Sequence, residues 1–143
     1  EETYDVGIDV GCLEMFVTDS DRQLYLNNLY RMLKPGAPLL FCRAAFDPDA
    51  IEDYIDTYDN WLTIAKQDVD MPELRNAYKD GTPYPIQLPN IAVRPRNLVH
   101  YEQELEHAGF EFLKGRISST GVQATFEVRK PDPEDDDDLY EDY

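Results

Sequence analysis

The chain is 143 residues long, the usual size of one domain, and its hydrophobic content of 42%, with ten Tyr and six Phe, is enough for a packed core. It carries 13 basic and 30 acidic residues and a net charge of −17, which argues against a nucleic-acid partner because such sites need a basic face. There is no run of about 18 apolar residues and no secretory signal, so we expect no membrane span and a cytoplasmic location.

The two cysteines, Cys12 and Cys42, stand in apolar surroundings. This favours reduced core thiols over a disulfide.

The acidic residues are unevenly distributed. Eight of them and no Lys or Arg lie after residue 130, which leaves a net charge of −9 on residues 1–130. A segment so polar and self-repelling does not bury itself, so residues 131–143 are predicted to form a disordered acidic tail. Such a tail either keeps the protein soluble or docks onto a basic partner.

Residues 4–46 organise the chain as strand, helix and strand. Residues 4–10 are rich in β-branched side chains and precede a turn at Gly11. Ser20 and Gln23 have the spacing of a capping box, which predicts that a helix starts at Ser20. Pro35 and Gly36 end this helix. Residues 37–46 are nearly all apolar, which is typical of a parallel strand buried on both faces, so the segment predicts a right-handed β-α-β crossover.

Residues 47–95 are predicted to form an insertion, part helix and part loop. Asp47 and Pro48 favour the start of a long amphipathic helix that continues to Ala65. A short helical piece is expected over residues 71–78. Four prolines between residues 81 and 95 then predict a stiff, extended loop without regular structure.

The last part of the chain predicts a helix and a β-hairpin. Apolar residues recur at helical spacing over residues 96–108, and Gly109 ends the helix. Residues 110–117 and 122–129 alternate in polarity and are joined by a Ser-Ser-Thr-Gly turn, which indicates two antiparallel strands.

Two stretches of this sequence resemble class I S-adenosylmethionine-dependent methyltransferases. The family's fourth strand is similar to YDVGID at residues 4–9. Its "LkPGG" segment, which leads into the fifth strand, is similar to RMLKPGAPLLF at residues 31–41, with Ala37 in place of the second Gly. Asp9-x-Gly11-x-Leu13 resembles the thiopurine and tellurite-resistance branch. Residues 97–110, which end in AGF, resemble the family's last helix, and the hairpin matches its sixth and seventh strands.

This resemblance implies an α/β fold, the C-terminal half of a Rossmann-like methyltransferase domain over residues 1–130, with a mixed sheet that ends in an antiparallel hairpin. It also implies S-adenosylmethionine as cofactor. The family's Gly-rich turn and ribose-binding carboxylate belong to strands that this sequence does not contain, so the cofactor site is expected to be incomplete. Residues 4–10 would then form an apolar sheet edge, which predicts self-association or a second polypeptide that supplies the N-terminal half.

Ligands of an open α/β sheet bind beyond the carboxyl ends of its strands. By resemblance, the turn there flanks the methyl group of the cofactor and comprises Asp9, Val10, Gly11, Cys12 and Leu13. Asp9 is equally interpretable as a turn former. Candidate substrate-binding residues are Glu14, Arg43, Phe46, Tyr54, Tyr58, Trp61 and Arg94; each is also interpretable as a core or ion-pair residue.

Methyl transfer from a sulfonium requires mainly in-line placement and exclusion of water, so no catalytic residue is identified. No Cys or His cluster has the spacing of a metal site, and His100 and His107 are interpreted as structural or surface residues.

The sequence therefore predicts S-adenosylmethionine-dependent methyl transfer to a small-molecule or protein acceptor, with the isolated chain inactive. Two alternatives stay open. One is a non-catalytic methyltransferase-like module that binds a basic partner through its acidic tail or its aromatic helix. The other is an acidic protein that binds basic proteins and uses the α/β body as a scaffold.

Overall fold

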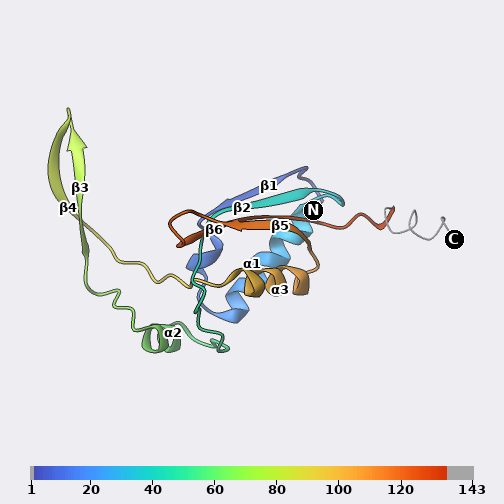
Figure 1. Ribbon diagram of the computed structural model, residues 1–143, viewed down its shortest axis with the longest axis horizontal. Helices are drawn as coiled ribbons and strands as arrows, with labels where there is room; N and C mark the ends of the chain where they lie inside the picture. The colour runs from blue at the N-terminus through green and yellow to red at the C-terminus, as the bar shows by residue number, and fades with distance from the viewer. Residues whose placement is uncertain (1, 135–143) are drawn as a thin grey trace.

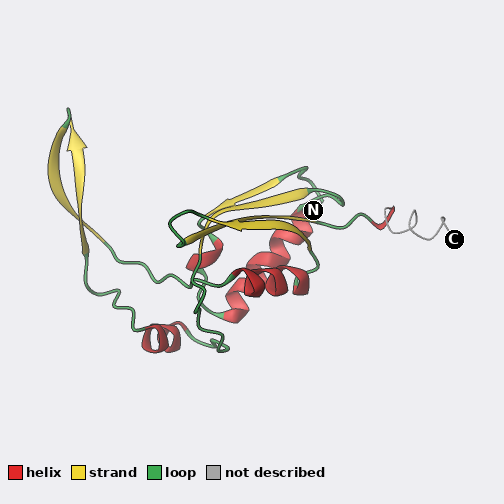
Figure 2. Cartoon of the chain, viewed as in Figure 1, coloured by secondary structure: helices red, strands yellow, loops and turns green. Residues whose placement is uncertain are grey.

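A computed structural model describes residues 2–134 and shows a mixed sheet with helices on one face (Figures 1 and 2). The strands follow the order β1-β2-β6-β5. β1 (Gly7–Val10) and β2 (Pro38–Ala45) are parallel, whereas β6 (Gln123–Arg129) is antiparallel to both β2 and β5 (Glu111–Ile117). The predicted parallel neighbours, the terminal hairpin and the mixed α/β fold are thereby confirmed.

The helix α1 (Asp19–Met32) connects β1 to β2 and begins earlier than predicted. Its N-cap is Thr18, whose backbone is extended and whose Oγ1 accepts a hydrogen bond from Asp21 N at 3.2 Å. The prediction that the helix starts at Ser20 is therefore wrong, because Thr18 caps the helix by binding the free N–H of Asp21 in its first turn. After the helix ends, Gly36 adopts a φ of +84°, which turns the chain into β2 as expected.

The main core lies between the sheet and the two helices α1 and α3 (Leu98–His107). Phe41 of β2 stacks on Phe126 of β6 with ring centroids 4.7 Å apart. Leu26 of α1 and Leu105 of α3 are completely buried against them. Lys130 fixes the far end of α1, since its Nζ donates to the carbonyl oxygens of Tyr30 and Leu33, each at 2.9 Å.

The opposite face of the sheet is covered by no helix within residues 2–134 (Figure 2). On this face Ile8 and Val10 of the edge strand β1 are 67% and 60% exposed. Leu40 of β2 is half-buried, while Leu39 and Phe41 on the helix side are fully buried. The prediction that β2 is buried on both faces is therefore correct for one face only, and the apolar edge expected at residues 4–10 is present.

The insertion differs most from the prediction. Residues 47–57 form no helix; only α2 (Tyr58–Ala65) does, and Thr57 caps it by accepting a hydrogen bond from Asn60 N at 3.1 Å. The carboxylate of Asp47 instead accepts from Asp49 N at 2.9 Å in an Asx turn, which competes with helix initiation. Trp61 of α2 is buried in a second, smaller core with Val17, Ile55 and Ala92.

Residues 71–78 were expected to be helical, which is wrong, and residues 81–95 were expected to be irregular, which holds for residues 89–95 but is wrong for residues 82–88. β3 (Glu73–Lys79) and β4 (Thr82–Leu88) form an antiparallel hairpin that projects from the body (Figure 1). Asp80 and Gly81 form the turn with φ values of +51° and +79°, as in the Asp-Gly turns of two-residue hairpins. Prolines are tolerated because each strand has one unpaired edge.

The predicted acidic tail, residues 131–143, lies outside the described residues except for 131–134. Cys12 and Cys42 are both free and half-buried, as expected.

Candidate functional site

The turn after β1 is held together by the carboxylate of Asp9. Asp9 is buried, and its two oxygens accept hydrogen bonds from Cys12 N at 2.9 Å and from Leu13 N at 3.1 Å. The hydroxyl of Tyr25 donates a third hydrogen bond at 2.6 Å. Burial, together with the hydrogen bond to Asp9, raises the pKa of Tyr25, so its proton stays in place. Asp9 therefore shapes this turn, which is the structural interpretation of this residue.

Gly11 and Arg43 meet at the carboxyl ends of β1 and β2. Gly11 has a φ of +66°, and its N–H donates to Cys42 O at 3.0 Å. A Cβ at Gly11 would lie 2.9 Å from Oε1 of Glu14 and 3.8 Å from the carbonyl oxygen of Arg43. Arg43 is exposed, has a φ of +56° and lies where the register of β2 shifts. A bulky residue in the left-handed region beside a bulge is strained, and such features concentrate at functional sites.

Glu14 lies beside this turn on the short helix η1 (Leu13–Met15). Its pKa is raised by partial burial and then by the negative charge of Asp9. A backbone hydrogen bond from Ala45 and the charge of Arg22 oppose this shift without cancelling it. Two carboxylates thus share the carboxyl end of the sheet, and only Asp9 is fully hydrogen-bonded.

That these turn residues bound one side of an S-adenosylmethionine site stays a prediction. The N–H groups of Gly11, Cys12 and Leu13 all bond within the protein, so the turn offers a cofactor carbonyl oxygens and apolar surface rather than donors. Val10 is exposed at this edge and would contribute apolar contact. Residues 2–134 contain neither a Gly-rich turn after a strand nor an acidic residue at the end of a neighbouring strand that could bind the ribose. We therefore expect other residues to provide the contacts to the rest of the cofactor.

The other candidate substrate-binding residues do not form one cluster. Phe46 is half-buried against the main core, whereas Tyr54 and Tyr58 are exposed. Trp61 is 1% exposed and Arg94 is 0% exposed, with the Arg94 guanidinium carbon 5.6 Å from the Trp61 ring centroid. In this structure the last two side chains are structural. A substrate-binding role for the exposed residues stays a prediction.

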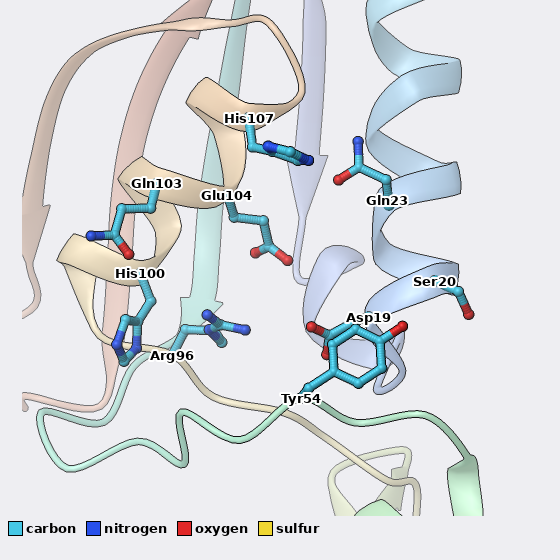
Figure 3. A pocket seen from close by; sticks show the side chains of 9 residues that line it. All are labelled: Asp19, Ser20, Gln23, Tyr54, Arg96, His100, Gln103, Glu104 and His107. Carbon is cyan, nitrogen blue, oxygen red and sulfur yellow. The ribbon is translucent and has the colours of Figure 1, made fainter.

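A pocket of about 590 Å³ lies between the N-terminal half of α1 and one face of α3 (Figure 3). Figure 3 shows polar side chains of both helices facing each other across it, with Tyr54 and Arg96 at one end. It is lined by Asp19, Ser20, Gln23, Tyr54, Arg96, His100, Gln103, Glu104 and His107. Of these, sequence reasoning had singled out only Tyr54 as a site residue. The available signal was the spacing of His100, Gln103 and His107, three and four residues apart, which places polar groups along one face of α3.

Two buried ion pairs form the wall of this pocket. Arg22 contacts Glu104 through two hydrogen bonds, from Nε to Oε2 at 2.7 Å and from Nη2 to Oε1 at 2.8 Å. Nη1 of Arg94 donates to Oδ1 of Asp19 at 2.6 Å. Burial would raise the pKa of Glu104, but the hydrogen bond and charge of Arg22 outweigh it and lower that pKa. Both carboxylates are therefore already paired with an arginine.

No group of three or more His, Cys, Asp or Glu side chains in the part of the chain that the structure describes could hold a metal ion. No helix among residues 2–134 is long and apolar enough to cross a membrane.

Comparison with solved structures identifies the fold. Neither a family model nor a curated protein sequence matches the chain. An S-adenosylmethionine-dependent methyltransferase from Methanosarcina mazei is similar with a TM-score of 0.59 at 16% identity over 92% of this chain and 61% of that chain. The 1,6-didemethyltoxoflavin-N1-methyltransferase of Burkholderia thailandensis, with S-adenosylhomocysteine bound, has a TM-score of 0.58 at 14% identity over 92% of this chain and 46% of that chain.

The fold also occurs with another activity. The [4+2]-cyclase SpnF is similar with a TM-score of 0.57 at 13% identity over 92% of this chain and 51% of that chain. The chain thus has the fold of S-adenosylmethionine-dependent methyltransferases and spans roughly half of the length of these neighbours.

Proposed function

We propose that this chain is the C-terminal part of the catalytic domain of an S-adenosylmethionine-dependent methyltransferase that acts on a small-molecule or protein acceptor. One observation carries the proposal. The parallel pair β1–β2, followed by the antiparallel β6 and β5, matches methyltransferase structures over 92% of the chain. The Asp9-x-Gly11-x-Leu13 turn favours the thiopurine and tellurite-resistance branch, and a cytoplasmic location is part of the same proposal.

The local geometry supports a cofactor at the carboxyl end of the sheet. Gly11 and the strained Arg43 lie next to each other there, and Val10 and the half-buried Cys12 are open to contact. S-adenosylmethionine would supply the electrophilic methyl group. The chain's own residues would bound one side of it, orient the acceptor and exclude water, which is most of what a sulfonium methyl transfer requires.

A complementing half that completes the cofactor site is part of the proposal. β1 is an edge strand with exposed Ile8 and Val10, and the sheet face beside it is uncovered within the described residues. We assign this edge and face to an N-terminal half of the domain, provided by the same polypeptide, a second polypeptide or a second copy.

Calorimetry with S-adenosylhomocysteine tests the proposal. The full-length gene product should bind it with a micromolar Kd, whereas residues 1–143 alone should bind at least about a hundredfold more weakly. The reason is that several hydrogen bonds of roughly 0.5–1.5 kcal/mol each are missing. Cooperative unfolding of the 1–143 chain is the control that it is folded. Absence of binding by the full-length product would contradict the proposal of methyl transfer. Micromolar binding by a monomeric 1–143 chain would contradict the proposal that a second half of the domain is needed to complete the site.

The competing proposal is a non-catalytic methyltransferase-like module that binds a basic partner through its acidic tail. The engagement of all three turn N–H groups with protein acceptors favours it, because the turn then holds itself together without a ligand. Three results together would support this proposal. The full-length product would bind a basic partner, it would lose this binding when residues 131–143 are removed, and it would not bind S-adenosylhomocysteine.

A further inference from the structure

The pocket between α1 and α3 contains a cation that lacks a counter-charge. Three guanidinium groups, from Arg22, Arg94 and Arg96, lie in or beside it, against the two carboxylates of Asp19 and Glu104. The pairs Arg22–Glu104 and Arg94–Asp19 use up both carboxylates. Arg96 is therefore left over.

The guanidinium of Arg96 makes no hydrogen bond or ion pair with any residue in the range 2–134, and its Nε is buried without a partner. The backbone of Arg96 is fixed, because its N–H donates to Ala45 O and its carbonyl oxygen accepts from Asp47 N, each at 3.2 Å. The side chain is therefore anchored at one end of the pocket and points between the two helices (Figure 3).

The Arg96 side chain is half-buried, and its Nε is enclosed without a hydrogen-bond partner. Burying a charge is unfavourable unless it is paired and hydrogen-bonded. Burial lowers the pKa of Arg96; Glu104 and Asp19 raise it, while Arg94 and Arg22 lower it further. In a chain with 30 acidic residues a protein carboxylate would be an easy partner, yet none reaches Arg96 within the described range. Residues 2–134 therefore supply no anion that pairs with this guanidinium.

Other polar groups of the pocket point to the same kind of ligand. Nε2 of His100 lies 2.8 Å from Oε1 of the exposed Glu52, while its buried Nδ1 has no partner. When Nε2 carries the proton donated to Glu52, Nδ1 holds a lone pair that accepts a hydrogen bond from a ligand hydroxyl. Ser20, Gln23 and Gln103 add neutral donors around the same space. A volume of about 590 Å³ suits a small metabolite-sized ligand.

We infer that this pocket binds a small molecule bearing a carboxylate or phosphate group, with Arg96 as its principal counter-charge. The planar fork of Arg96 matches either oxyanion through two parallel N–H···O bonds. His100 would contact a neighbouring polar group of the ligand. This inference does not depend on the proposed methyl transfer, because the pocket lies between the helices and uses none of the turn residues after β1.

Titration of the full chain with inorganic phosphate and, separately, with citrate tests the inference, with sodium chloride at equal ionic strength as reference. The Nε–Hε resonance of Arg96 in ¹⁵N NMR and the Tm are the readouts. We expect saturable binding by at least one of the two anions below about 20 mM, and the anion that binds identifies phosphate or carboxylate as the preferred group. No saturable binding beyond the chloride reference by either anion would overturn the inference.

Arg96→Gln is the test variant and Arg116→Gln its matched control, because Arg116 is exposed on β5 and its loss changes the net charge equally. R96Q should weaken anion binding at least about tenfold, whereas R116Q should leave it within about twofold. R96Q should also raise the Tm without anion, since a half-buried charge without an ion-pair partner is removed; a purely structural arginine would lower the Tm on replacement. Equal binding by R96Q and the full chain would overturn the inference.

Discussion

At the scale of single residues, Glu14 shows how the carboxyl end of the sheet is charged. Its pKa is raised by burial and by Asp9, so the folded state holds this proton more tightly than the unfolded state does. The stability that follows is full below the ordinary Glu pKa and is lost as the pH rises through the raised value. At neutral pH the ionised Glu14 therefore lowers the free energy of unfolding.

Replacing Glu14 with Gln should raise the free energy of unfolding at pH 7 by under about 1 kcal/mol, a small effect because the side chain is only partly buried and solvent screens its charge. The gain should shrink near pH 4, where wild-type Glu14 becomes protonated. Urea unfolding at both pH values measures it. Glu106→Gln, at an exposed position of α3, is the control and should change stability little at either pH. An equal gain at both pH values would show that packing, not charge, is responsible.

At the scale of elements, the β3–β4 hairpin is separate from the cores. Nearly all of its side chains are exposed, with only Ala77 and Ile86 half-buried, and it projects from the body (Figure 1). A hydrogen bond from Nδ2 of Asn90 to Asp68 O at 2.9 Å joins the two chain segments at its base. A two-stranded hairpin is marginally stable by itself, so the body should not depend on it.

Replacing residues 71–88 with a short Gly-Ser linker should leave the free energy of unfolding within about 0.5 kcal/mol, measured by urea denaturation. The contrasting variant is Trp61→Ala in the neighbouring element α2, which should cost about 3–5 kcal/mol because that ring is fully buried. A large loss on removal of the hairpin would mean that it packs on the body in solution.

At the scale of the whole molecule, the sheet is apolar at its β1 end and charged at its β5 end. Ile8 and Val10 are exposed at β1, and Lys114 pairs in register with Glu127 across β5 and β6. Edge strands with exposed apolar side chains pair readily with other chains. The uncovered face beside β1 is the surface on which we expect self-association or a complementing half.

Sedimentation of the 1–143 chain at about 100 µM should show dimers or larger species, because a micromolar contact is well populated there. The double variant Ile8→Lys/Val10→Lys should be monomeric. Val122→Lys, at an exposed position in the turn between β5 and β6, should associate like the wild type. A monomeric wild type would contradict self-association and leave the complementing half as the partner.

Short sequence patterns were enough to predict the end of the first helix, the strand after it and the C-terminal hairpin. The Pro-Gly stop before β2, the apolar run of residues 37–46 and the Ser-Ser-Thr-Gly turn between β5 and β6 each act over a few residues, and the predicted elements are present. The turn at Asp80 and Gly81 is equally local, but the prediction for this segment considered only its four prolines. Prolines exclude only central strands, and this hairpin has two free edges.

Tertiary structure alone decided which charges remain unpaired. Arg22 reaches Glu104 across 82 residues, and Arg94 reaches Asp19 across 75. No local pattern assigns these partners, because an ion pair depends on where the packing of α1 against α3 brings each side chain. Arg96 differs from Arg94 by two positions in the sequence. Arg94 is buried with the carboxylate of Asp19, whereas Arg96 faces a pocket whose two carboxylates are already paired with other arginines.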